Sequence, residues 1–196
     1  NAAKANRAPL IQMKSCQVHP ISADSHGSTA DYHTDSREWK NLTISLPGDH
    51  QMLNTLVVLG ITEELEKQGI RIPEKAVRSG LADTFWPGRL EWSGNVLMDG
   101  AHNEQGITAF RRFAMEYLRD RKTVLLCGVL KEKLSDGMLD QLSSITGDAV
   151  TVTPDSPRAL NAGELADLLA QKGMRACAAN NLKDGLQKAK ELAGNR

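Results

Sequence analysis

Aromatic side chains are scarce in this sequence. Phe, Trp and Tyr make up 4% of the 196 residues, whereas 40% of the residues are hydrophobic. A core must therefore be built mainly from Leu, Val, Ile, Ala and Met, and the composition is that of a globular chain rather than a disordered one. The length suits one domain, or one domain and part of another.

The sequence also lacks a net charge and a long hydrophobic run. Lys and Arg together number 24, and so do Asp and Glu, so a general nucleic-acid binder is disfavoured because no long-range field attracts a polyanion. No apolar run approaches the roughly 20 residues that span a bilayer, and the first residues lack the hydrophobic core of a signal peptide. We therefore expect a cytoplasmic protein without a membrane or nucleic-acid partner.

Cysteine and histidine are few, and neither is spaced for a metal. The three cysteines lie far apart without a Cys-x-x-Cys pair, which favours neither a zinc site nor a disulfide framework and fits a reducing cytoplasm. His19, His26 and His33 are seven residues apart, a spacing that fits no metal-binding helix, and we expect them to be exposed loop residues.

Residues 1–48 are predicted to contain short strands. Residues 9–19 have the composition of a strand, and residues 39–46 alternate imperfectly between apolar and polar side chains, as a half-buried strand does. The polar residues 22–37 between them predict a loop or a polar hairpin.

From Asp49 the period of the apolar residues changes to three and four. This spacing predicts a helix of about five turns with one apolar face, capped at its start by Asp49 and ended at Gly69. A shorter helix is expected from Pro73, and the cluster of Gly and Pro in residues 80–88 predicts a hinge. The apolar face is expected to contain Leu53, Leu56, Val57, Ile61 and Leu65.

Beyond the hinge, strands and helices alternate through residues 89–196. This order predicts an α/β domain of Rossmann-like type, with a mostly parallel sheet covered by helices on both faces. Because the sequence ends on an expected helix, we expect the domain to lack a last strand. The strands are expected at "NVLMDG", "TVLLCGVL", "AVTVTP" and "MRACAA", of which the second is typical of a central strand.

Polar residues follow the strand expected at residues 95–98 and come directly before a helix. Ligands of parallel sheets bind beyond the carboxyl ends of the strands, where helix N-termini point their N–H groups at the site. Asp99, His102 and Asn103 are therefore candidates by position. The same residues suit an ordinary capped connection, and Arg89 taken alone is typical of a solvated surface residue.

Four motifs in a fixed order resemble those of one family. "WPGRLEW", then a strand and "DGAHN", resemble the start of the C-terminal domain of folylpolyglutamate and dihydrofolate synthases, members of the Mur ligase superfamily. The upstream "LPGDHQMLNTLVVLG" resembles the Gly-x-His-Gln-x-x-Asn-Ala helix that ends the family's central ATPase domain. "LLCGVLKEK" and "TPDSPRAL" resemble two later segments, so the resemblance covers most of residues 42–160.

The resemblance implies an ATP-dependent amide-bond ligase that adds L-glutamate to a folate or to dihydropteroate. In this family ATP phosphorylates the substrate carboxylate, the amino group of glutamate attacks the acyl phosphate, and phosphate leaves. Such a reaction needs cations that offset the charge of the transferred phosphoryl group, and it needs both substrates held in line. The implied cofactors are ATP and Mg²⁺, and the implied parent enzyme is a monomer.

The resemblance also implies a role for individual residues. Asn54 matches the asparagine that meets the adenine, where an amide can both donate and accept. Arg89 matches an arginine that reaches the ATP phosphates, and Asp99 matches an aspartate on the ribose hydroxyls. His102 matches a histidine near the reacting phosphate or the glutamate, so Arg89 and His102 are the implied catalytic residues.

Three basic residues have two interpretations that the sequence leaves open. Lys131, Lys133 and Arg158 either bind the glutamate carboxylates or are solvated loop charges.

Parts of the family pattern are missing from the sequence. It contains no GxxxxGK[ST] phosphate-binding loop, no counterpart of the acid and histidine that hold magnesium, and no counterpart of the lysine that is carbamylated in many members. We therefore expect residues 1–79 to be the end of the ATPase domain and the chain to be an inactive fragment, with the magnesium ligands upstream. The alternatives are another amino-acid ligase of the superfamily, or a non-catalytic Rossmann-like nucleotide-binding module.

Overall fold

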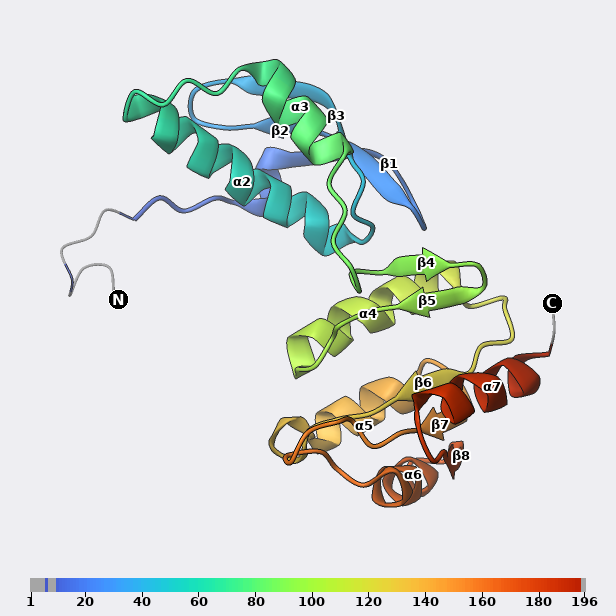
Figure 1. Cartoon of the computed structure of the whole chain (residues 1–196). Coiled ribbons are helices and arrows are strands. Elements are labelled where there is room, and N and C mark those ends of the chain that lie inside the picture. Colours follow the sequence, from blue (N-terminus) through green and yellow to red (C-terminus); the bar gives the residue numbers. More distant parts are fainter. Residues whose placement is uncertain (1–5, 7–9, 195–196) are drawn as a thin grey trace. The chain divides into compact units, whose positions relative to one another are not determined.

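The chain folds into two compact units in the computed structural model, which describes residue 6 and residues 10–194 (Figure 1). The first unit is Asn1–Asp99 and the second is Gly100–Arg196. The hinge predicted at residues 80–88 lies inside the first unit, and helix α3 (Glu74–Ala82) extends into it. The predicted domain boundary stays a prediction.

The first unit is an antiparallel sheet with a long helix packed across it (Figure 1). The sheet has the order β1-β2-β3, and every second residue of β2 is buried because successive side chains point to opposite faces. Tyr32 and Trp39 from the sheet pack with Leu56 and Leu59 from α2 in one core. The elements are β1 (Val18–Asp24), β2 (Gly27–His33), β3 (Glu38–Ile44) and α2 (Asp49–Lys67), preceded by a 3-10 turn at Ser15–Gln17.

The polar stretch before β3 is a hairpin, which is one of the two alternatives the sequence left open. Oδ1 of Asp24 accepts hydrogen bonds from the backbone N–H groups of His26 and Gly27, at 2.7 Å and 3.1 Å, and so closes the turn between β1 and β2. The strand predicted at residues 9–19 was placed too early, since β1 begins at Val18. His19 lies in β1 and His33 in β2, so the prediction that they are loop residues was wrong.

Helix α2 carries aliphatic side chains on both of its sides. Leu56 and Leu59 face the sheet and are 2% and 0% exposed, whereas Leu53, Val57 and Ile61 are 46%, 48% and 55% exposed. The predicted single apolar face was therefore wrong, because residues four apart form a row of their own on the side away from the sheet.

The helix start also differs from the expectation. Gly48, with φ of 99°, is the N-cap of α2, and Asp49 is the first helical residue without a capping side-chain bond. The Asp49 charge still stabilises the helix, because it lies at the positive end of the helix dipole.

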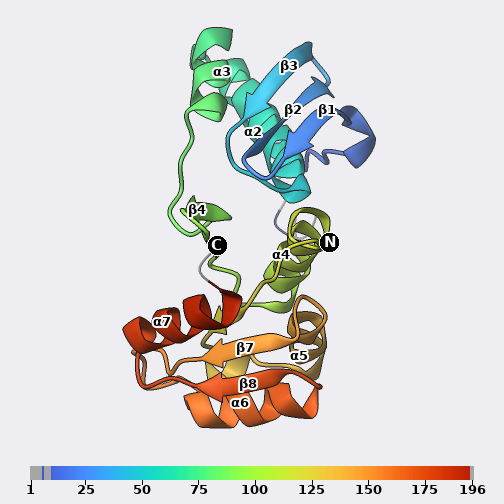
Figure 2. The same ribbon diagram turned by 90° about the vertical axis from the view of Figure 1, so that its right-hand side faces the viewer.

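The second unit is a three-stranded parallel sheet between helices, so the predicted α/β fold class is confirmed. The sheet order is β6-β7-β8, and neighbouring residues of β7 face opposite ways: Ala149 packs with α5 and α6, and Val150 packs with α7. Figure 2 shows α7 on one face of β7 and β8 and α6 on the other. The elements are α4 (Glu104–Tyr117), β6 (Leu125–Cys127), α5 (Asp136–Ser143), β7 (Asp148–Thr151), α6 (Ala162–Gln171), β8 (Arg175–Ala178) and α7 (Leu182–Ala193).

Two details of the predicted sheet were wrong. The strand expected at residues 95–98 is β5 (Val96–Met98), which pairs antiparallel with β4 (Glu91–Ser93) in a separate hairpin. Gly94, with φ of 60°, and Asn95 form its two-residue turn, and a Gly-Asn pair between two strands is a hairpin sequence. The segment "TVLLCGVL", predicted to be a central strand, contains β6, which lies at the edge of the described sheet. The central strand of that sheet is β7.

Candidate functional site

The first unit brings the start of α2 near two of the predicted site residues, Arg89 and Asp99. Partial burial lowers the pKa of His50, the second residue of α2, from its usual value. Of the charged neighbours of His50, Asp99 opposes this shift, Arg89 adds to it, and Asp49 opposes it. The charges of Arg89 and Asp99 thus both act on the pKa of His50.

Gly48 and the buried Leu90 lie beside His50 at the start of α2. A Cβ atom at Gly48 would lie 2.9 Å from Cε1 of His50 and 3.0 Å from Cδ1 of Leu90, and Gly48 has a positive φ. Any other residue at this position would therefore push the histidine and the leucine apart. The backbone N–H of Leu90 donates to Oδ2 of Asp99 over 3.0 Å, which joins the segment after Arg89 to the end of β5.

The Pro-Gly turn presents Arg89 to solvent. The N–H of Arg89 donates to the carbonyl of Trp86 over 3.2 Å, and the N–H of Gly88 donates to Oε2 of Glu91 over 2.8 Å. Leu90, with φ of 48°, is in the left-handed region that non-glycine residues rarely adopt, and its side chain is only 3% exposed. The unusual backbone turns Leu90 inward while Arg89 stays exposed.

Asn54 lies on the exposed side of α2, about one turn after His50. Its Nδ2 donates a hydrogen bond of 3.0 Å to Oε1 of Gln51, and Nε2 of Gln51 lies 3.1 Å from Nε2 of His50. His50 and Gln51 were not singled out from the sequence as site residues, although both stand in the motif that pointed to Asn54. The structure therefore adds a connected polar row to the predicted asparagine.

In the second unit, His102 and Asn103 precede α4. Nδ1 of His102 lies 2.9 Å from the carbonyl oxygen of Gly100, so Nδ1 carries a proton because a carbonyl only accepts. The Asn103 side chain accepts from the N–H of Gly106 over 2.8 Å and is the N-cap of α4. The capping interpretation of Asn103 is thus confirmed, while His102 is exposed.

Lys131 and Arg158 come together through their backbones. The N–H of Lys131 donates to the carbonyl of Arg158 over 2.9 Å. Nη1 of Arg158 forms an ion pair of 2.7 Å with Oε1 of Glu132, and all three side chains are exposed. An exposed pair of this kind stabilises a protein by no more than about 1 kcal/mol, so a carboxylate ligand would compete with Glu132 at little cost. Lys133 lies in the same short 3-10 turn, Lys131–Lys133.

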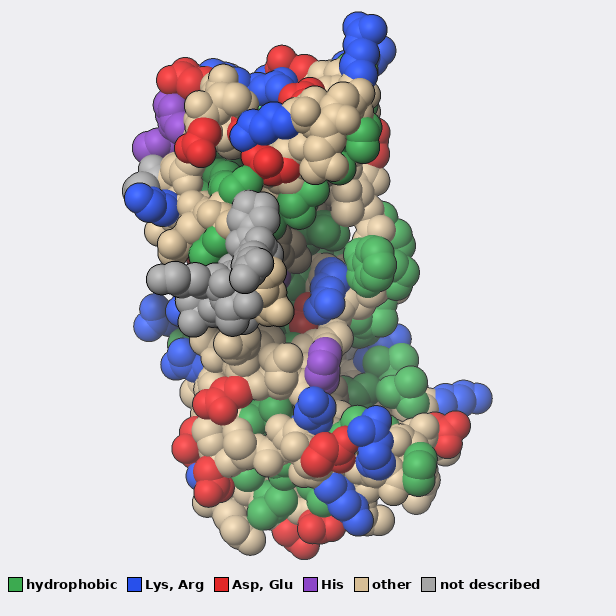
Figure 3. Space-filling view, turned by 90° about the vertical axis from the view of Figure 1, so that its left-hand side faces the viewer, with side chains coloured by type: hydrophobic (Ala, Val, Ile, Leu, Met, Phe, Trp, Pro, Cys, Tyr) green, Lys and Arg blue, Asp and Glu red, His purple; other side chains and the backbone are tan. Residues whose placement is uncertain are grey.

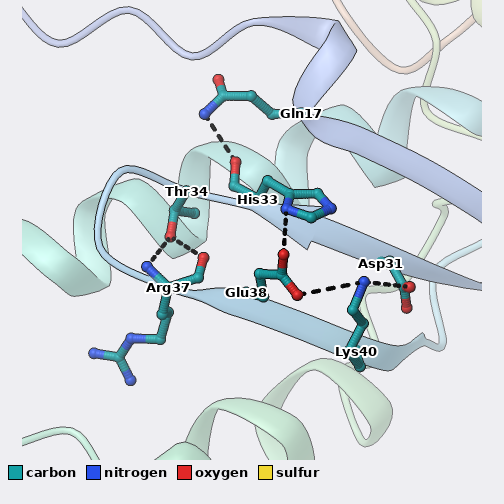
Figure 4. A network of polar contacts seen from close by, with 7 residues as sticks. All are labelled: Gln17, Asp31, His33, Thr34, Arg37, Glu38 and Lys40. Carbon is teal, nitrogen blue, oxygen red and sulfur yellow. Dashed lines mark hydrogen bonds and ion pairs between the residues drawn. The ribbon is translucent and has the colours of Figure 1, made fainter.

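The charged residues of β2 and β3 form a network of their own. His33 lies 3.2 Å from Glu38, and Nζ of Lys40 lies between Glu38 and Asp31, at 3.5 Å and 3.1 Å (Figure 4). Within residues 10–194, no group of three or more His, Cys, Asp or Glu side chains is placed to hold a metal ion. Burial raises the pKa of the Cys127 thiol to about 12, so that thiol is no nucleophile at neutral pH.

The surface charge matches the neutral composition. On the face drawn in Figure 3, acidic and basic side chains are interspersed. No helix in the described part of the chain is long and apolar enough to cross a membrane.

A Rossmann-like parallel sheet with helices on both faces, preceded in the sequence by an antiparallel unit, defines an α/β protein. Residues 88–196 match the family model described as "Mur ligase, glutamate ligase domain". The chain belongs to this family.

Individual relatives agree with the resemblance that the motifs predicted. The chain is 29% identical over 170 residues to a dihydrofolate synthase/folylpolyglutamate synthase of Bacillus subtilis, covering 84% of this chain and 40% of the relative. It is 28% identical over 168 residues to the folylpolyglutamate synthase of Lacticaseibacillus casei, covering 83% of this chain and 37% of the relative.

Solved structures extend the likeness to nearly the whole chain. The folylpolyglutamate synthase of Mycobacterium tuberculosis, complexed with ADP, superposes with a TM-score of 0.84 and 26% identity, over 97% of this chain and 43% of that chain. The resemblance to folylpolyglutamate synthases is therefore confirmed. The chain spans less than half the length of these relatives.

Proposed function

We propose that the chain supplies ATP-binding and glutamate-binding residues of a ligase that adds L-glutamate to a folate or to dihydropteroate. The observation that supports this most is that Leu90, whose N–H donates to Asp99, lies with His50 beside Gly48 at the start of α2, in a family of glutamate ligases. The relative from Mycobacterium tuberculosis was solved with ADP, which fits a nucleotide site.

In the proposed reaction, one oxygen of the substrate carboxylate attacks the γ-phosphorus of ATP, and ADP leaves. The amino group of glutamate then attacks the acyl carbon, and phosphate leaves with that carboxylate oxygen. Arg89 offsets the charge that grows on the transferred phosphoryl group, because a planar guanidinium can donate to two oxygens at once. Asp99 accepts from the ribose hydroxyls, and Asn54 pairs with the adenine edge.

Three residues of the second unit are proposed to contact the incoming glutamate or the reacting phosphate. His102, with its proton held on Nδ1 by the Gly100 carbonyl, can accept through Nε2 from the glutamate amino group or act near the phosphate. Lys131 and Arg158 bind glutamate carboxylates in this proposal, since both are exposed cations on adjoining backbone segments.

Mg²⁺ supplies charge neutralisation at ATP phosphates when it is bound. Among the described residues, no group of three or more His, Cys, Asp or Glu side chains is placed to hold it, so no described residue is assigned to the ion. We further propose that residues 1–79 end an ATPase domain, that residues 80–88 are its hinge to the domain at 89–196, and that the parent enzyme is a cytoplasmic monomer.

The test is an assay of the protein at its native length with dihydropteroate or tetrahydrofolate, L-glutamate and ATP. With an ¹⁸O-labelled substrate carboxylate, one labelled oxygen is expected in the phosphate released for each amide formed. Release of ADP without glutamate incorporation, or of unlabelled phosphate, would contradict the proposal. Replacing glutamate by other amino acids in the same assay tests whether the ligase adds a different residue.

A further inference from the structure

The backbone joins the Lys131–Lys133 turn to the segment that carries Arg158. Leu130 and Ala159 form an isolated antiparallel bridge, next to the hydrogen bond from the N–H of Lys131 to the carbonyl of Arg158. Both segments are anchored on the core of the second unit, because aliphatic residues close to the charges pack against it: Val129, Leu134 and Leu160. The backbone is therefore held in place, while the charged side chains lie in solvent.

Glu132 is an acidic residue among three cations. Lys131 and Lys133 flank it in the turn, and Nη1 of Arg158 donates to its Oε1 over 2.7 Å. In the described part of the chain, the Arg158 guanidinium forms no other ion pair. Glu132 is thus the counter-ion that the chain itself provides for Arg158.

The pair between Arg158 and Glu132 is easily exchanged. The two side chains are 67% and 42% exposed, and water and salt screen charges at such positions. The turn nevertheless keeps Glu132 within reach of Arg158 whenever no other anion is bound. A carboxylate that arrives from solution can therefore take the place of Glu132 on the guanidinium.

Glu132 weakens the binding of a second carboxylate at Arg158 in two ways. It occupies Nη1, and a carboxylate that binds a guanidinium in bidentate fashion needs two parallel N–H groups. Its negative charge also repels another negative charge close by. Both effects disappear when the side chain at this position is uncharged and releases Arg158 more readily.

We propose that Glu132 is an internal counter-ion that sets the KM for L-glutamate by exchanging with a substrate carboxylate on Arg158. Glu132 holds Arg158 in the absence of the amino acid and leaves it when the amino acid binds. This inference rests on the proposed function, in which Lys131 and Arg158 bind the glutamate carboxylates. Glu132 is a positioning residue that acts through Arg158 and does not touch the substrate.

The first test measures kcat and KM for L-glutamate in the native-length protein. Glu132→Gln removes the charge but keeps an oxygen that can accept from Arg158. It should lower KM by about three- to fivefold, as the loss of an exposed competing pair allows, and leave kcat within about twofold.

Two variants are the matched controls. Glu132→Asp keeps the charge and should keep KM within about twofold of the wild-type value. Glu164→Gln, in the exposed first turn of α6, makes the same change in net charge elsewhere in the second unit. It should also leave KM within about twofold, because an exposed charge acts only over short distances at physiological salt.

Salt gives a second readout, which a purely structural role of Glu132 would not change. Chloride competes for a cation that has lost its counter-ion, so KM of Glu132→Gln should rise more steeply with NaCl than KM of the wild-type protein. A lower KM that is independent of salt would contradict the exchange of carboxylates.

A double variant tests whether Glu132 acts through Arg158. Arg158→Ala should raise KM for L-glutamate about tenfold, since a hydrogen bond between charged groups is lost. Adding Glu132→Gln to Arg158→Ala should change KM by less than about twofold, because the group on which the exchange occurs is gone. A full gain in the absence of Arg158 would overturn the proposed exchange.

The outcomes separate the two proposals. Glutamate ligation in which Glu132→Gln leaves KM unchanged, or raises it, overturns the role of Glu132 alone. A wild-type protein without ATP-dependent glutamate ligation, or an Arg158→Ala variant with an unchanged KM, overturns the proposed function of these cations, and the inference with it.

Discussion

Helix α6 of the second unit and helix α2 of the first use their apolar residues differently. In α6, Leu165 and Leu169 are fully buried and the exposed positions include Glu164 and Asp167. In α2 a buried aliphatic side coexists with an exposed aliphatic row. Helix α6 thus places its leucines in the core of the second unit, whereas four of the seven aliphatic residues of α2 are exposed and contribute little to the core of the first unit: Leu53, Val57, Val58 and Ile61.

The largest expected effects come from the buried side of each helix. Leu59→Ala in α2 and Leu169→Ala in α6 should each lower the free energy of unfolding by about 3 kcal/mol, because both side chains are 0% exposed and would leave a cavity. Urea denaturation followed by circular dichroism measures the loss in each variant. A loss below about 1 kcal/mol for Leu59→Ala would mean that α2 is not packed on its sheet as described.

Gly185 in the second unit and Gly80 in the first differ in the space available for a side chain. A Cβ at Gly185 of α7 would lie 2.8 Å from Cγ1 of Val152 and 2.9 Å from Cδ1 of Leu126, whereas a Cβ at Gly80 of α3 would meet nothing within 4 Å. Gly185→Ala should therefore destabilise the second unit by about 1 kcal/mol, after the gain in helix propensity. Gly80→Ala should stabilise the first unit by up to about 1 kcal/mol. Melting temperatures that move in the same direction for both variants would contradict this difference.

The smallest expected effects belong to the exposed row of α2. Val57→Ala and Ile61→Ala should change the free energy of unfolding of the 196-residue chain by less than about 0.5 kcal/mol, because half of each side chain is already in water. The same urea titration used for Leu59→Ala provides the matched comparison. A loss similar to that of Leu59→Ala would show that the row is covered within this chain.

Much of the second unit follows from sequence periodicity, since its helices bury one face each and alternate with short strands. Periodicity could not distinguish the buried side of α2 from its exposed aliphatic row, because Leu56 and Val57 are both aliphatic. They differ in whether another element packs against them. The β4–β5 hairpin was missed even though its Gly-Asn turn stands in the sequence, because residues 95–98 also fit the first strand of a parallel sheet.

The candidate site followed from the resemblance more than from any local pattern. Arg89 taken alone has the character of a surface arginine. His50 and Leu90, 40 positions apart in the sequence, both lie beside Gly48, which has no side chain to separate them. Periodicity contains no such long-range information, so the polar row from His50 to Asn54 appears only in the structure.

The most direct test of the account compares two arginines of the first unit in the native-length protein. Arg89 is proposed to contact the ATP phosphates, whereas Arg78 pairs with Glu74 over 2.7 Å and donates to the carbonyl of Lys40 over 2.9 Å. Arg89→Ala should lower kcat for ATP-dependent glutamate ligation by more than about tenfold, and Arg78→Ala should leave it within about twofold. Near-normal turnover in Arg89→Ala would contradict the account.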